Sequence, residues 1–517
     1  MDALINSIHE VIVAIRDFVW GPFFLMPLLL LSGLYLTVRY GGLQFRTLGR
    51  ALKLGFVQRK DDSDDGDISQ FQALTTALAA TVGTGNIVGV ATALSIGGPG
   101  ALFWMWVTAL LGMATKYSEA FLGVLYRTND AKGEKSGGPP YYLERGLGSW
   151  YGKVLGLLFA IFAFFASFGI GNMTQGNSIA SNVENSFNVE PWITGLILTV
   201  LTLVVLLGGI KSIGNVTSAL VPVMIVFYVL GSLWLLIANA GQLPEALGMV
   251  FTDAFTGTSA VGGFAGSAMI IAIQYGVARG IFSNESGMGS AAIAAAAAKT
   301  THPVRQGLVS MTQTFIDTII VVTCTGLVLI TTGAWQAGER QEAAIMTANA
   351  FTEGLPGNWG HLIVTIGLIL FAYSTMLAWS YYGERNVERL LGRAWVMPYR
   401  VLFCIVIYLG CTLPLEIVWD FSDLTNGLMA VPNIIGLLAM SGLIARETKR
   451  YLQIDPRMDS SAEDIDRQMS HVSWWQAWRH DNLTEPFYQL GAEESPTHSY
   501  SAGQSDGRGH FRETDRF

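Results

Sequence analysis

The sequence predicts an all-α integral membrane protein that crosses the bilayer many times, and three observations support this fold class. Charged residues make up 14% of the chain and hydrophobic residues 51%, whereas soluble domains are roughly 25% charged. The 58 glycines also fit, because small residues let transmembrane helices approach closely. Apolar runs of about 20 residues, the length that spans a hydrocarbon core, recur along the chain.

These runs predict eleven transmembrane helices, one of which precedes two sets of five. We expect them, in order, at residues 18–38, 71–96, 99–125, 154–181, 191–209, 215–239, 262–288, 307–331, 359–384, 398–418 and 424–445.

Two of the eleven runs, 71–96 and 262–288, are poor continuous helices. Glycine and polar residues interrupt the first at Val82 to Asn86 and the second between Gly276 and Gly289. Irregular backbone at membrane depth must face a cavity or be buried in protein, because its peptide groups cannot stay unpaired in lipid. Broken spans at matching places in two halves indicate a transporter site near the bilayer midplane. A single motif of this kind would instead be interpreted as helix-packing glycine.

The order of the spans predicts an inverted repeat. Ranges 71–239 and 262–445 each hold five spans, and each begins with a broken one. Since five is odd, the second range enters the membrane from the opposite side. We therefore expect a transmembrane domain over 1–445 and a tail over 446–517, which is partly disordered because its composition is strongly polar.

Basic residues in the loops orient the chain. Lys and Arg are six in loop 39–70, five in loop 126–153 and none in loop 240–261. Cytoplasmic loops carry the excess of basic residues, so we expect the N-terminus outside and the C-terminus in the cytoplasm. The expected location is the inner membrane of a bacterial cell.

Five segments of the chain resemble the sodium:alanine symporter family. The longest is GGPGALFWMWVTALLG at 97–112, and the others are GTGNI at 83–87, GGPPYY at 137–142, RGIFSNE at 279–285 and SYYGE at 380–384. The resemblance covers about residues 15–450. It implies the LeuT-type superfamily fold with a five-plus-five inverted repeat, alanine or glycine as substrates, and coupling to sodium or sometimes to protons.

The resemblance also assigns roles around the first break. The N–H groups of Thr84 and Gly85 would hold the substrate carboxylate, as exposed N–H groups at a helix start favour an anion. The carbonyls of Ala79 and Val82 would face a cation. Asn86 would orient the unwound chain or contact the substrate.

In the ninth span, adjacent hydroxyls match the superfamily's shared sodium site. Ser374 and Thr375 would supply hydroxyl oxygens, and Phe371 would add a carbonyl. Without the resemblance, a Ser-Thr pair in a transmembrane helix more often bonds the carbonyl four residues earlier.

The remaining substrate contacts are expected from three other spans. Carbonyls in the second broken span would face the substrate ammonium, through Gln274, Gly276, Val277 and Gly280. Gln175 and Asn172 on the fourth span line the pocket or form interhelical hydrogen bonds. Trp379 would limit substrate size, although tryptophan near a span end is otherwise an interfacial anchor.

Charged residues inside spans are functional candidates. Lys116 and Glu119 are three apart and share one helix face, and Glu119 occupies the place where the superfamily braces the second broken helix. Arg279 and Glu285 flank that break. We interpret all four as structural charges. Asp317 is left unassigned.

The predicted function is therefore secondary symport of sodium with a small neutral amino acid. The alternatives are a proton-coupled transporter using Glu119, Glu285 or Asp317, and a passive channel. An enzyme is not expected, because no ligand cluster or Ser/His pair occurs within the spans. We expect sodium, the amino acid and membrane lipid as partners, with no nucleic acid and no cofactor, and a functional monomer is compatible with the sequence.

Overall fold

The computed structural model describes residues 2–465 except 60, 62, 64, 257–264, 337–342, 358, 414–415 and 462–463. The predicted tail beyond residue 465 lies outside the described residues.

The first half of the chain is helical apart from one short hairpin. Its helices are α1 (Asp2–Val19), α2 (Leu25–Arg39), α3 (Leu43–Leu52), η1 (Lys53–Gln58), α4 (Gln70–Thr81), η2 (Thr84–Asn86), α5 (Val88–Gly97), α6 (Gly100–Leu125), α7 (Pro139–Leu147), α8 (Trp150–Phe168), η3 (Gly169–Met173), α9 (Thr174–Phe187), α10 (Pro191–Leu207), α11 (Gly209–Ala238), η4 (Ala240–Gln242) and α12 (Leu243–Thr256). Strands β1 (Thr128–Asn129) and β2 (Lys135–Ser136) pair antiparallel between α6 and α7.

The second half, as far as it is described, is also helical. Its elements are α13 (Ala265–Asn284), α14 (Ala291–Ala296), α15 (Pro303–Thr314), η5 (Phe315–Val322), α16 (Thr323–Thr331), η6 (Ala334–Gln336), α17 (Ala343–Gly354), α18 (Gly360–Leu391), η8 (Arg393–Trp395), α19 (Val396–Thr412) and α20 (Glu416–Ile454). Helix α20 continues to Ile454, past the predicted domain end at residue 445.

Several of these helices are long and apolar enough to cross a membrane. Among the described residues, six pass this test: 150–187, 209–238, 303–331, 360–391, 393–412 and 419–454. The bent pair of α4 with residues 84–97 raises the number to seven, and α2 and α10 are shorter apolar helices. The multi-pass prediction is confirmed. The count of eleven spans and the inverted repeat remain predictions.

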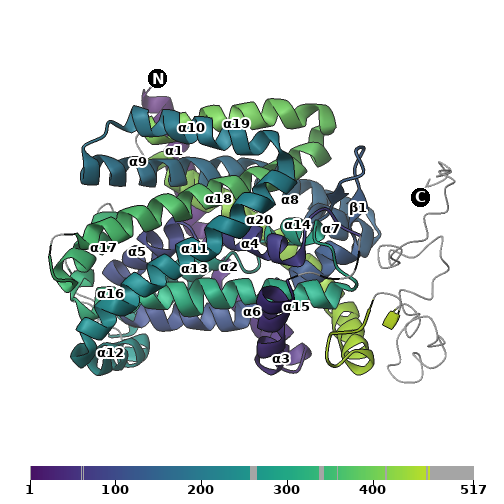
Figure 1. Ribbon diagram of the computed structural model, residues 1–517, viewed down its shortest axis with the longest axis horizontal. Coiled ribbons are helices and arrows are strands. Elements are labelled where there is room, and N and C mark those ends of the chain that lie inside the picture. The colour runs from purple at the N-terminus through teal and green to yellow at the C-terminus, as the bar shows by residue number, and fades with distance from the viewer. Residues whose placement is uncertain are drawn as a thin grey trace.

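The helices pack in layers around a buried interior. In Figure 1, α9, α10 and α19 lie along one side of the molecule and α6 and α15 along the opposite side, with α11 and α18 between them. Helix α4 contacts both α11 and α18. Helix α14 is alanine-rich and fully buried against α6, where small side chains permit close helix approach. The discontinuous backbone is therefore enclosed by protein.

Local sequence explains how the first discontinuous helix begins. Ser69 and Gln72 form a reciprocal capping box: the Ser69 hydroxyl accepts from the Gln72 N–H, and the Gln72 side chain accepts from the Ser69 N–H. This arrangement satisfies two polar groups at the helix end. It fixes the start of α4 and so the position at which the chain reaches the break.

Candidate functional site

The first discontinuous helix consists of α4 and α5, which are bent by 59° at the break between them. The Asn86 side chain stabilises the turn by accepting a hydrogen bond from the Gly83 N–H at 2.9 Å. A β-carbon added at Gly83 would lie 2.5 Å from Thr375 Oγ1, so glycine permits the turn to approach α18 this closely. The break lies where the sequence predicts it.

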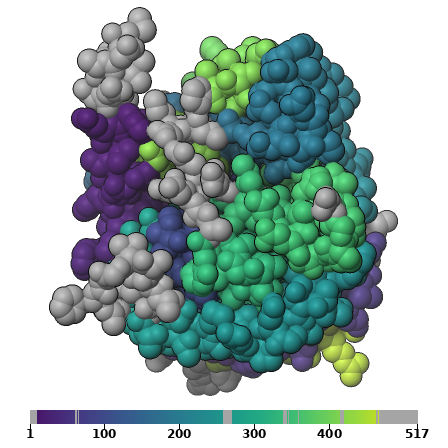
Figure 2. All heavy atoms as spheres, turned by 90° about the vertical axis from the view of Figure 1, so that its left-hand side faces the viewer, coloured from purple at the N-terminus to yellow at the C-terminus, as the bar shows by residue number. Residues whose placement is uncertain are grey.

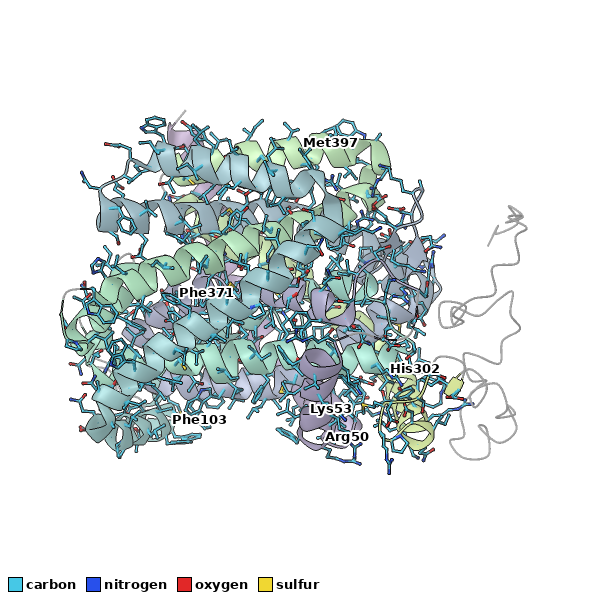
Figure 3. The ribbon with its side chains drawn as sticks, in the orientation of Figure 1. Arg50, Lys53, Phe103, His302, Phe371 and Met397 are labelled. Carbon is cyan, nitrogen blue, oxygen red and sulfur yellow. The ribbon has the colours of Figure 1, made fainter. Side chains whose placement is uncertain are left out.

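Two carbonyls and two hydroxyls converge between α4 and α18. Thr375 Oγ1 lies 2.9 Å from the Ala79 carbonyl and 3.1 Å from the Phe371 carbonyl. Ser374 Oγ lies 2.8 Å from the Phe371 carbonyl and 3.4 Å from that of Ala79. Phe371, labelled in Figure 3, is buried on α18. The hydroxyls thus contact both their own helix and α4. Val82, whose carbonyl is also predicted to face a cation, is buried at the C-terminal end of α4.

Gln175 on α9 contacts the first break. Its Oε1 accepts from the Thr84 N–H at 3.3 Å, and its Nε2 donates to the Ile170 carbonyl at 2.8 Å. Thr84 is fully buried, and its Oγ1 has no hydrogen-bond partner among the described residues. Asn172 instead donates to the Phe403 carbonyl at 2.8 Å, which directs it toward α19. Of the two polar candidates on this span, Gln175 is the one at the break.

The second break lies between α13 and α14. Glu285, Gly287 and Gly289 have φ of 55°, 92° and 81° there, a left-handed region that favours glycine. Lys116 Nζ donates to the Glu285 carbonyl at 3.0 Å. Glu119 Oε1 accepts from the Gly289 N–H at 2.9 Å. Two charged side chains of α6 therefore hold this turn from one side.

The predicted location of free carbonyls in the second broken span is wrong. Residues 274–280, which include Gln274 and Val277, lie within the continuous helix α13, so their carbonyls are used by intrahelical hydrogen bonds. A β-carbon at Gly276 would overlap the Ala101 carbonyl, and one at Gly280 would lie 3.2 Å from Met105 Cα. These glycines allow α13 to pack against α6, and the chain unwinds only after α13 ends.

The two breaks meet at the end of α13. A β-carbon at Gly85 would lie 3.1 Å from Ser283 Cα and 3.3 Å from the Phe282 ring. The first break therefore touches the last turn of α13 directly. The C-terminal end of a helix carries partial negative charge, so this contact brings such an end next to the first break.

Asp317, which the sequence offers only as a carboxylate for the proton-coupled alternative, joins both segments. Its Oδ1 accepts from Asn86 Nδ2 at 2.7 Å, and its Oδ2 accepts from Ser283 Oγ at 2.9 Å and Thr318 Oγ1 at 2.7 Å. It is fully buried in the π-helical segment η5, and such segments often occur at functional sites. A carboxylate within an apolar span was the signal that could have identified it.

Trp379 is buried within α18 and is not at an interface. Its side chain is 0% exposed, and Nε1 donates to Glu285 Oε1 at 2.8 Å. Glu285 Oε2 accepts from Ser290 Oγ at 2.6 Å. The indole therefore links α18 to the second break. Arg279, which the sequence predicts to flank that break, lies within α13 and pairs with Asp423 at 2.8 Å.

The site is closed from solvent in this conformation. Thr84, Asn86, Ser374 and Trp379 are 0% exposed, and Gln175 is 2% exposed. In the end-on view of Figure 2, the green atoms of α17 and α18 pack closely against neighbouring helices. These residues are therefore enclosed by protein in this conformation.

A network of ion pairs lies at one end of α18. Arg385 is buried and contacts Asp130 at 3.0 Å and Glu384 at 3.1 Å. Burial alone would raise the pKa of Asp130, but the N–H groups of Lys132 and Glu134, together with Arg385, outweigh it and lower this pKa. Asp130 therefore stays ionised at neutral pH and ties the β1–β2 hairpin region to α18.

Comparisons with known proteins show which family the chain belongs to. The Sodium:alanine symporter family matches residues 5–464. The chain is 54% identical over 443 residues to the Sodium/alanine symporter AgcS of Methanococcus maripaludis, covering 85% of this chain and 96% of that protein. It is 36% identical over 453 residues to the Probable sodium/glutamine symporter GlnT of Bacillus subtilis, covering 86% and 91%.

A solved structure supports the fold. The structure of MhsT in complex with L-phenylalanine matches with a TM-score of 0.53 at 14% identity, covering 80% of this chain and 95% of that one. This likeness confirms the predicted LeuT-like fold, and the relatives confirm the predicted family and a transporter rather than an enzyme. Since the family matches nearly the whole described chain, this protein belongs to the sodium:alanine symporter family.

Proposed function

We propose that this protein couples inward sodium movement to the uptake of alanine or glycine. The observation that carries the proposal is the cluster of carbonyl and hydroxyl oxygens from Ala79, Phe371, Ser374 and Thr375. Neutral oxygens of this kind bind sodium at the unwound helices of transporters. The cluster bridges α4 and α18, so a bound sodium ion would hold the first break against α18.

The amino acid would bind between the two breaks. The N–H groups of Thr84 and Gly85 suit its carboxylate, because N–H groups at a helix start favour an anion. The last turn of α13, at Phe282 and Ser283, suits its ammonium group through the negative end of the helix dipole. This proposal replaces the predicted carbonyls of residues 274–280, which are used within α13.

Gln175 and Trp379 would complete this pocket. The Thr84 hydroxyl lacks a partner among the described residues and is available to the substrate. The indole of Trp379 would close the pocket on one side and restrict it to small side chains, since it is held in place by Glu285 at 2.8 Å.

The transport cycle would use the inverted repeat proposed above, with the N-terminus outside the cell and the C-terminus in the cytoplasm of a bacterium. Sodium and substrate bind from outside, and the two breaks then open inward. One charge moved across 100 mV supplies about 2.3 kcal/mol and a tenfold sodium gradient adds about 1.4 kcal/mol. Together these allow roughly several-hundredfold accumulation of substrate.

Proton coupling is the alternative that one observation favours. Asp317 is a buried carboxylate in contact with both Asn86 and Ser283, so a proton on it would change the hydrogen bonds of both discontinuous segments. Sodium coupling remains the main proposal, because the uncharged oxygens on α4 and α18 can bind sodium without the transfer of a proton.

Counterflow in proteoliposomes tests the substrate assignment. Vesicles loaded with unlabelled alanine and sodium should exchange it for external labelled alanine. Replacing the internal alanine with glycine should retain exchange, whereas phenylalanine should not support it. Exchange with phenylalanine at the alanine rate would contradict the assignment to a small neutral amino acid.

A further inference from the structure

A basic cavity of about 550 Å³ lies between the end of α2, the start of α3 and the last turns of α20. Among the described residues that line it, four are cations, namely Arg39, Arg46, Arg446 and Lys449, and none is a carboxylate. The adjacent Glu447 lies 3.4 Å from Arg446 Nε. The cavity therefore has an excess of positive charge and suits an anionic group such as a phosphate.

The cavity lies at the end of an apolar stripe on the surface of α2. Leu31, Leu34, Tyr35 and Val38 are 63%, 47%, 47% and 72% exposed. Their spacing of three and four residues places them on one helix face, and Arg39 follows directly. In a membrane protein such an exposed apolar stripe faces lipid tails. An occupant with a phosphate and acyl chains would use both features at once.

The region around the cavity is held in a defined shape. Arg50 Nη1 on α3 donates to the Pro456 carbonyl at 2.9 Å, and Figure 3 shows Arg50 and Lys53 on the projecting end of α3 and η1. Tyr40 and Thr448 line the cavity and bond Ser118 at 2.8 Å and Tyr117 at 2.5 Å on α6. An occupant would therefore contact two residues that bond the helix that braces the second break.

We propose that this cavity binds the headgroup of an anionic phospholipid, with its acyl chains lying along the α2 stripe. Basic pockets between transmembrane helices bind such headgroups. A free phosphate would use the cations alone, whereas a phospholipid also covers the apolar stripe. The site is separate from the transported amino acid and does not depend on the proposed transport function.

Thermal unfolding of the full-length protein in neutral detergent tests the proposal. Dioleoylphosphatidylglycerol should raise the melting temperature, because a ligand that binds only the folded state stabilises it. Dioleoylphosphatidylcholine, which has the same acyl chains, and inorganic phosphate should leave it nearly unchanged. Equal shifts with phosphatidylcholine, or a full shift with phosphate alone, would overturn the proposal.

Variants locate the effect in the cavity. Each cation near an anionic lipid strengthens binding about fivefold. The double variant Arg39→Gln/Arg446→Gln should therefore weaken phosphatidylglycerol binding about 25-fold. The control Lys153→Gln with Lys211→Gln removes two exposed positive charges elsewhere and should stay within about twofold of the unmodified protein. Unchanged binding in the cavity variant would refute the site.

The single variant Arg39→Gln provides an independent test if the double variant does not fold. It should weaken phosphatidylglycerol binding about fivefold, and Arg39→Lys should restore most of it. If Arg39→Gln binds phosphatidylglycerol as the unmodified protein does, the assignment of the headgroup to this cavity is wrong.

Discussion

Removing the hydroxyl of Thr375 should weaken sodium binding without removing the transporter fold. Thr375 Oγ1 is 2.9 Å from the Ala79 carbonyl and 3.1 Å from the Phe371 carbonyl, and the side chain is 1% exposed. In the proposed site this oxygen is one of the sodium ligands. A hydrogen-bonding interaction with a charged group contributes about 1.5–3 kcal/mol, so Thr375→Ala should raise the half-saturating sodium concentration roughly 10- to 150-fold.

Thr375→Ser is the matched control, because it keeps the hydroxyl and removes only a methyl group. Loss of that methyl costs about 1 kcal/mol of stability, but the half-saturating sodium concentration should stay within about threefold of the unmodified protein. The assay is the initial rate of labelled alanine uptake into proteoliposomes, measured over a series of external sodium concentrations. Melting temperatures of both variants would show that each is folded.

The difference in sodium dependence between the two variants tests whether the Thr375 hydroxyl binds sodium. Equal sodium dependence in Thr375→Ala and Thr375→Ser would mean that the hydroxyl is no ligand. Its role would then be limited to the hydrogen bonds with the Phe371 carbonyl of its own helix and the Ala79 carbonyl.

Three further predictions follow from other contacts. Gly83→Ala should abolish sodium-dependent uptake, because its β-carbon would lie 2.5 Å from Thr375 Oγ1. The control Gly248→Ala should transport normally in the same assay, because its β-carbon would have no neighbour within 4 Å. Asp317→Asn should lower the melting temperature, because the Asn86 and Ser283 donors lose a charged acceptor, which costs about 1–3 kcal/mol of stability. Uptake by this variant should remain sodium-dependent. A shift in the pH dependence of uptake would instead support proton coupling. Arg385→Ala should cost about 1.5–3 kcal/mol of stability, because Asp130 and Glu384 lose one charged partner but keep Arg393 and Arg400 respectively. An unchanged melting temperature would contradict the role of this network.

The first break could be predicted from sequence because its cause is local. Glycines flank Thr84, and Asn86 is close enough along the chain to bond the Gly83 N–H. The hydroxyls of Ser374 and Thr375 are different, because their contact with the Ala79 carbonyl joins residues about 295 positions apart. Only the family resemblance pointed to this pair.

The second break could not be located from glycine content alone. Gly276 and Gly280 pack α13 against α6, while Gly287 and Gly289 adopt positive φ and end the helix. Glycine serves both purposes in membrane helices. The neighbouring helix decides between them, and that helix is distant in sequence.

Long-range contacts were also beyond the sequence pattern. Asp317 bonds Asn86, a residue 231 positions away. Trp379 lies near a predicted span end, which is typical of an interfacial anchor, but α18 continues to Leu391 and buries it beside Glu285. Helix length and partner position, rather than residue type, determined both outcomes.

Coupling between sodium and substrate is tested most directly by the level that alanine reaches in vesicles. Proteoliposomes would receive an inward sodium gradient at fixed pH, and internal labelled alanine would be followed over time. The proposed symport predicts a transient internal concentration well above the external one, which disappears when the vesicles are first equilibrated with sodium. An identical time course with choline in place of sodium would contradict it.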